Sequence, residues 1–211
     1  MIAALYVQTN GCYFGLPDID PWDEARDART YAGPWPVVAH PPCQRWGRYW
    51  GGSPTTWPRL IKGNDGGCFA AALAAVRQWG GVIEHPEGSA AWEHFGLMAP
   101  PRAGGWVPAD WPMHGGWTCC VEQGAYGHRA RKATWLYAHG VDLPPLAWGS
   151  APGDFLRLNE GYHSADERRR AIKTGAGKRL SARQRAATPI PFRDLMLSIA
   201  RTAERGLAHV A

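Results

Sequence analysis

The chain has 211 residues, which is enough for one domain with a hydrophobic core. Hydrophobic residues make up 45% of the chain and charged residues 19%, and this balance excludes a disordered protein. The net charge of +5 favours a polyanionic partner, and no apolar run is long enough to predict a membrane-spanning helix. No signal peptide is recognisable, so we expect a cytoplasmic protein whose five cysteines are reduced.

The first half of the chain predicts alternating strands and helices. Apolar runs at 2–7, 36–39 and 82–84 are typical of buried strands, and residues 67–79 are typical of a helix. Between the first two runs we expect a Gly- and Pro-rich loop and then one or two helical turns at 22–31. Strand, loop, helix and strand at this spacing predict parallel strands, and ligands bind beyond the carboxyl ends of such strands.

The second half of the chain predicts two more strands, at 118–122 and 134–138, and a final helix at 191–207. Between them, residues 168–185 contain eight Lys and Arg residues and no acidic residue. This basic segment is either a solvated face of the protein or a surface that neutralises phosphates.

Cys43 lies in the stretch VVAHPPCQRWGRY (37–49), directly after two prolines that end a strand. Prolines restrict the backbone in front of Cys43, and Arg45 and Arg48 bring positive charge, which would favour a reactive thiolate. The alternative is that Cys43 is a small buried apolar residue, the usual role of a free cysteine.

Glu84 ends the strand at 82–84 and is followed by His85 and Pro86. A carboxyl group at the carboxyl end of a parallel strand faces the same edge as Cys43, where it could hydrogen-bond a ring nitrogen. The alternative is a carboxylate at the edge of a loop, paired with a Lys or Arg side chain.

Three motifs together resemble those of the DNA cytosine-C5 methyltransferases. PPCQ (41–44) resembles the motif of the catalytic cysteine, and IEHP (83–86) resembles the Glu-Asn-Val or Glu-Asn-Pro motif. HRARKATWLY (128–137) resembles the Arg-x-Arg motif and the strand that follows it. The order and approximate spacing of the motifs match over about residues 36–138.

The resemblance implies a covalent mechanism on a cytosine that is flipped out of the duplex. Cys43 would attack C6, Glu84 would contact N3 and the exocyclic amine, and Arg131 would hold the base. Other residues assigned to contact the base or DNA are Gln44, Arg45, Trp46, Arg129, Lys178, Arg179, Arg183 and Arg185. Trp46 or Tyr49 would fill the space that the flipped base leaves.

The resemblance also implies the fold and the origin of the chain. We expect one α/β domain, a reduced Rossmann-like methyltransferase core with a mostly parallel sheet. The core would span residues 1–150, and a basic C-terminal extension with a helix would span 151–211 in the same domain. The small size suggests a phage or mobile-element protein, which would act in the host cytoplasm.

The part of the family that binds the methyl donor is altered in this chain. The stretch ALYVQTNGCYFG (4–15) replaces the Phe-x-Gly-x-Gly loop for S-adenosylmethionine, and His85 replaces the Asn of the Glu-Asn-Pro motif. Thymidylate synthase and deoxycytidylate hydroxymethylase also attack C6 with a cysteine, but they use methylenetetrahydrofolate. The donor is therefore undecided between these two molecules, with 5-methylcytosine or 5-hydroxymethylcytosine as product.

Several residues are assigned to binding of the one-carbon donor: Tyr13, Asp20, Trp22, Pro42 and His85. Tryptophans such as Trp35, Trp50 and Trp57 could stack on a pterin or could merely pack the protein.

Two other interpretations compete with this one. His85-Pro86-Glu87 matches the His-x-Glu motif of zinc nucleotide deaminases, but adjacent cysteines at 119 and 120 on a strand point to opposite faces, so we expect no metal. The chain could also be a degenerate methyltransferase-like module that only binds DNA or completes a partner.

Overall fold

The structure is a computed structural model that describes residues 1–47, 50–52, 57–156, 164–174 and 180–203. Its centre is a seven-stranded sheet with the strand order β2-β1-β3-β4-β7-β6-β5. The strands are β1 (Ile2–Leu5), β2 (Ile19–Trp22), β3 (Val37–Ala39), β4 (Gly81–Pro86), β5 (Val107–Pro108), β6 (Trp117–Glu122) and β7 (Ala133–His139).

The sheet is mixed, although the sequence predicted a mostly parallel one. β1 pairs in parallel with β2 and β3, and β3 with β4, whereas the pairs β4–β7, β7–β6 and β6–β5 are antiparallel. β6 and β7 are joined by only ten residues, 123–132, which is too short for the crossover that parallel neighbours need. β7 is antiparallel to both of its neighbours, β4 and β6, so β6 runs in the same direction as β1 to β4.

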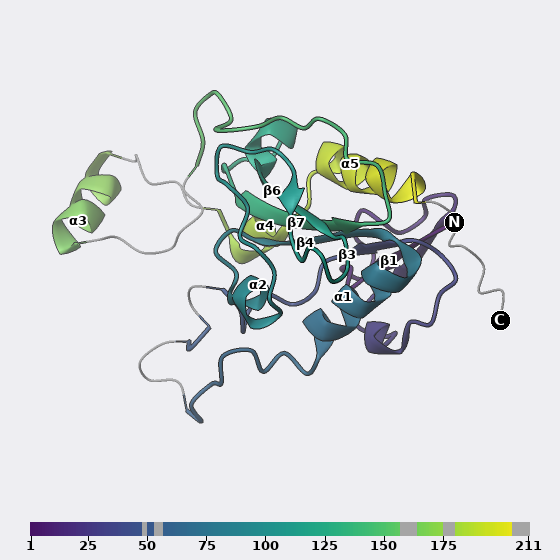
Figure 1. Ribbon diagram of the computed structural model, residues 1–211. Helices are drawn as coiled ribbons and strands as arrows, with labels where there is room; N and C mark the ends of the chain where they lie inside the picture. The colour runs from purple at the N-terminus through teal and green to yellow at the C-terminus, as the bar shows by residue number, and fades with distance from the viewer. Residues whose placement is uncertain (48–49, 53–56, 157–163, 175–179, 204–211) are drawn as a thin grey trace, which may run out of the picture.

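Helices cover both faces of the sheet (Figure 1). The helical elements are η1 (Ala28–Thr30), α1 (Cys68–Trp79), α2 (Ala90–His94), η2 (Gln123–Tyr126), α3 (Ala165–Thr174), α4 (Ala182–Ala186) and α5 (Ile190–Arg201). α1 and α5 lie on opposite faces, and α3 lies apart from the sheet. The expected helices at 67–79 and 191–207 are confirmed as α1 and α5 within the described residues, whereas strand β2 was not predicted and only the short η1 forms at 22–31.

The core has two layers because successive strand residues point to opposite faces. Ala39 and Ile83 pack on the α1 side, whereas Val38 and Val82 pack on the α5 side. β1, β3 and the first half of β4 are buried on both faces, which is why they are continuous apolar runs in the sequence, whereas the edge strand β2 is only half-buried. Gly81 opens β4 with φ at 132°, and a Cβ there would lie 1.9 Å from the carbonyl oxygen of Val37.

One edge of the sheet collects the ends of six strands. The carboxyl ends of β1, β2, β3, β4 and β6 lie there, and the reversed β7 begins there. The chain also switches sides at this edge, because β2 lies on one side of β1 and β3 on the other. Such a switch point is where ligands bind in open α/β sheets.

Candidate active site

His40 and Glu84 meet at this edge because β3 and β4 are in register. Ala39 pairs with Ile83, so the next residue of each strand lies beside its neighbour on the α5 side of the sheet. The His40 Nδ1 atom lies 3.0 Å from Glu84 Oε2, and each side chain keeps only 12% of its surface exposed.

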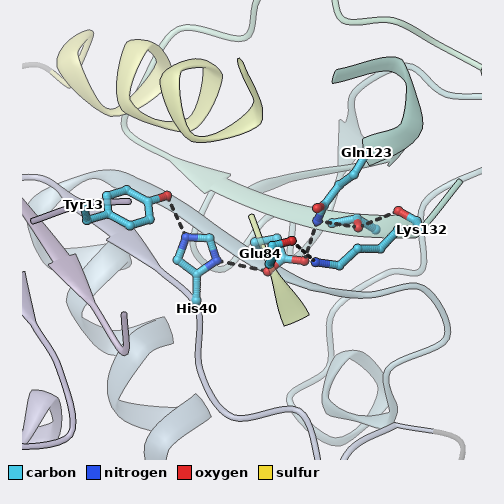
Figure 2. A network of polar contacts seen from close by, with 7 residues as sticks. Tyr13, His40, Glu84, Gln123 and Lys132 are labelled. Carbon is cyan, nitrogen blue, oxygen red and sulfur yellow. Dashed lines mark hydrogen bonds and ion pairs between the residues drawn. The ribbon is translucent and has the colours of Figure 1, made fainter. Parts of the chain in front are cut away.

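Glu84 is the centre of a chain of hydrogen bonds that joins side chains from several segments of the protein (Figure 2). Tyr13 Oη lies 2.8 Å from His40 Nε2, on the far side of the imidazole from Glu84. Gln123 Nε2, at the start of η2, donates to Glu84 Oε1 at 3.1 Å and to Thr134 Oγ1 at 3.1 Å. Both carboxylate oxygens of Glu84 are therefore held by protein donors.

These contacts keep the Glu84 carboxyl group ionised. Burial alone would raise its pKa, but the hydrogen bond from His40 and the positive charge of Lys132 outweigh burial and lower the pKa to about 2. The Glu84 carboxylate can therefore accept hydrogen bonds from a ligand but brings no proton of its own at neutral pH.

Cys43 lies in a short rigid turn at the same edge. Its carbonyl oxygen accepts hydrogen bonds from the backbone N–H groups of Trp46 and Gly47 at 3.0 and 2.9 Å. Burial and the negative charge of Glu84 raise the pKa of the Cys43 thiol, whereas the charge of Lys132 lowers it. The turn begins three residues after His40, which contacts Glu84, and the raised pKa keeps the proton on the sulfur in the free protein.

The basic side chain whose charge acts on Glu84 and Cys43 is Lys132, the neighbour of Arg131, which the sequence predicted to hold the base. Arg131 has a 48% exposed side chain that lies 3.6 Å from Glu122 and over the ring of Phe155. Lys132 points toward Glu84, and its Nζ donates to the Ala187 carbonyl at 3.2 Å (Figure 2). Its φ of 44° is rare for a residue with a Cβ, and such strain occurs at functional sites.

Trp46 is a structural anchor, which corrects its assignment as a base contact or wedge. Only 3% of the residue is exposed, and its ring packs against Phe69 and Phe95. Its indole N–H donates to Asp65 Oδ2 at 2.7 Å, and the same carboxylate accepts the N–H of Phe69 at the start of α1. Trp46 therefore fixes the Cys43 turn to helix α1, while the alternative wedge, Tyr49, lies outside the described residues.

His85 points away from Glu84, to the α1 side of the sheet. It is 1% exposed, its Nδ1 lies 2.6 Å from Ser89 Oγ, and its ring lies against Phe69 and Trp92. Burial lowers the pKa of His85 to about 4, even though Glu84 and the nearby carbonyl of Pro42 raise it. A residue in this position supports the loop above it and is not available to a donor molecule.

The other residues assigned to the donor come from three segments of the chain. Tyr13 is 3% exposed on the α5 side, where it belongs to the Glu84 network. Asp20 is paired with Arg26 at 2.6 Å, and the guanidinium of Arg26 lies 3.9 Å from the ring centre of Trp22. Pro42 lies next to Cys43 and is half-buried.

Several basic residues surround the edge. Helix α4 lies beside the 128–132 segment, because His128 Nε2 contacts the carbonyl of Gln184 at 3.2 Å and Leu180 is buried. Arg129 and Arg183 are exposed, and Gln44 beside Cys43 is exposed as well. The half-buried residues are Arg45 and Arg185, and the two residues that lie outside the described part of the chain are Lys178 and Arg179.

The described residues contain neither a metal-binding cluster nor a membrane-spanning helix. No group of three or more His, Cys, Asp or Glu side chains there could hold a metal ion, and no helix is long and apolar enough to cross a membrane. A surface cavity of about 420 Å³ lies between Arg77, Asp110 and Trp111, and neither Cys43 nor Glu84 lines it.

Comparison with family models, curated proteins and solved structures found no match to this chain.

Three residues of the site were missed from the sequence: His40, Gln123 and Lys132. His40 had a usable signal, since it follows Val38 by two residues as Glu84 follows Val82, and both therefore face the same side. Lys132 lies in the basic motif but one position after the expected arginine. Gln123 carries no sequence signal, because its position depends on the pairing of β6 with β7.

Proposed function

We propose that this protein modifies C5 of cytosine in DNA through a covalent adduct between Cys43 and C6 of the base. The observation that carries this proposal is a cysteine in a hydrogen-bonded turn, three residues after His40, whose ring contacts the ionised, partly buried Glu84 at the switch-point edge of the sheet. A thiol and a carboxylate are what conjugate addition to a pyrimidine requires: a nucleophile for C6 and a proton carrier for N3.

Cys43 and Glu84 together supply the proton that the addition to the base requires. In the free protein the proton is on Cys43 and Glu84 is ionised. When the base binds, Glu84 takes the thiol proton and passes it to N3 while the sulfur bonds to C6. Electron density then accumulates at C5. Lys132 stabilises the thiolate during this transfer because its positive charge lowers the pKa of Cys43.

S-adenosylmethionine or methylenetetrahydrofolate would supply the one-carbon electrophile for C5. After transfer, loss of the C5 proton and elimination of the Cys43 thiolate restore the aromatic ring. The product would be 5-methylcytosine with the first donor and 5-hydroxymethylcytosine with the second, since water would then add to the exocyclic methylene group.

DNA is the proposed form of the substrate because cations from two segments flank the site. Arg129 and Arg131 come from the β6–β7 connection, and Arg183 comes from α4, which packs beside that connection. Exposed arginines at the rim of a site contact phosphates rather than bases, and such contacts give affinity without sequence preference.

A test that needs no donor is hydrogen exchange at C5. In heavy water the Cys43 adduct takes up a deuteron at C5, loses the original C5 proton to the solvent and eliminates the thiol. Mass spectrometry of the nucleosides then detects deuterated cytosine. We expect exchange with the wild-type protein, no exchange with Cys43→Ala, and full exchange with the control Cys68→Ala at the start of α1.

Exchange that persists in Cys43→Ala would refute the covalent mechanism. The same DNA incubated with each donor in turn identifies the product. No exchange and no product with either donor would favour the non-catalytic alternative, in which the chain binds DNA or completes a partner.

A further inference from the structure

The side-chain amide of Gln123 has a fixed orientation. The Thr134 hydroxyl has one proton, which it donates to the Lys132 carbonyl at 3.0 Å, so it accepts a hydrogen bond from Gln123. The Glu84 carboxylate is also an acceptor. Two acceptors therefore face the NH₂ group of Gln123, and turning the amide over would point its carbonyl oxygen at both of them.

The carbonyl oxygen of the same amide has no hydrogen-bond partner. Gln123 is completely buried, and its Oε1 is one of the few buried polar atoms in the described residues without a partner. An unpaired buried acceptor is costly, and in a native protein it indicates a ligand or an internal water. This oxygen belongs to the amide that contacts Glu84, so it is next to the carboxylate that the proposed base would meet.

The candidate site therefore contains acceptors that the protein does not fully pair. His40 and Gln123 each occupy one oxygen of Glu84, which leaves the remaining lone pairs of the carboxylate and the free Oε1 of Gln123. A pyrimidine that matches two neighbouring acceptors must carry two neighbouring N–H donors. Cytosine protonated at N3 has them, at N3 and at the 4-amino group, whereas uracil and thymine carry a carbonyl at C4.

We propose that Gln123 determines specificity for cytosine, with its fixed carbonyl oxygen accepting a hydrogen bond from the 4-amino group and repelling the C4 carbonyl of uracil or thymine. This inference rests on the proposed function, because it assumes that the base lies against Glu84. Thr134 acts as a positioning residue that prevents the amide from turning over.

The experiment compares pyrimidines that carry different groups at C4. Single-stranded oligonucleotides carry cytosine, uracil or 2-pyrimidinone, which has hydrogen in place of the amine. The readouts are C5 exchange in heavy water and binding measured by fluorescence anisotropy. Wild-type protein is expected to prefer cytosine over 2-pyrimidinone by roughly 10- to 100-fold, the effect of one buried hydrogen bond.

Gln123→Met keeps the size of the side chain but removes the amide, so we expect the preference for cytosine over 2-pyrimidinone to disappear. Thr134→Val keeps Gln123 but removes one acceptor that fixes it, so uracil is expected to improve relative to cytosine. Both outcomes are ratios between substrates, which a general loss of stability would not change. The control Ser198→Ala alters an exposed hydroxyl on α5 and should leave the ratios unchanged.

The inference is overturned if wild-type protein treats the three bases alike, or if Gln123→Met keeps the wild-type ratio. If an internal water and not the base occupies Oε1, Gln123→Met would keep the wild-type ratio. Failure of the proposed function looks different, because exchange would then be absent for every base. In that case the anisotropy ratios still decide whether Gln123 selects the 4-amino group.

Discussion

His85 is expected to make the protein sensitive to acid, because it is buried in its neutral form. Its pKa is lowered from 6.5 to about 4 in the folded protein, so the unfolded chain binds a proton that the folded one does not. The stability that neutral His85 provides is fully present above pH 6.5 and is lost as the pH falls toward 4. The difference in pKa corresponds to about 3 kcal/mol of unfolding free energy at pH 4.

Urea denaturation at a series of pH values from 7 to 4, followed by tryptophan fluorescence, measures this contribution. His85→Phe keeps a ring between Phe69 and Trp92 but cannot titrate. Both proteins should lose unfolding free energy as the pH falls from 7 to 4, and the loss should be about 3 kcal/mol smaller in His85→Phe than in the wild type. Other titrating groups are common to both proteins and cancel in the comparison. His114→Gln, at an exposed position, should follow the wild type.

Equal losses in wild type and His85→Phe would refute this reasoning. That result would mean that His85 is solvated or charged in the folded protein, and its assignment to a donor pocket would then have to be considered again.

Three further predictions concern the Cys43 turn, its electrostatics and DNA. Trp46→Ala should lower the unfolding free energy by about 3–5 kcal/mol in urea, because it removes a buried ring and the bond to Asp65; a loss below about 1 kcal/mol would restore Trp46 as a wedge. Lys132→Met should move the pH dependence of C5 exchange toward alkaline pH, because the positive charge that lowers the pKa of Cys43 is removed; an unchanged profile would remove Lys132 from the site. Arg183→Gln should reduce the slope of log binding constant against log salt concentration for DNA by about one unit. Arg26 is already paired with Asp20, so the control Arg26→Gln should leave this slope unchanged.

The sequence predicted the elements on which the two main site residues lie. Strands β3 and β4 are buried on both faces and are therefore visible as apolar runs, and helix α1 ends at Gly80 as expected. The rule that the carboxyl ends of parallel strands share an edge places the segment after β3 beside the end of β4, where His40 contacts Glu84.

The sequence could not predict features that depend on pairing between distant strands. β2 contains Pro21 and charged Asp20 and is only four residues long, so it has no apolar pattern of its own. The antiparallel pairing of β7 decides that Lys132, and not Arg131, acts on Glu84. The burial of Trp46 follows from its bond to Asp65, which belongs to a different loop.

The reversal of β7 has a consequence for how this protein could be enlarged. The connection from β6 to β7 is a hairpin whose ends are neighbours in the sheet, so it can grow outward without moving either strand. Doubling its ten residues would cost only about 0.6 kcal/mol in chain entropy. Gly127 is an exposed position in this connection, and an insertion there would add new surface near Glu84. The hairpin is therefore the position at which sequence-reading residues could be grafted onto this small scaffold.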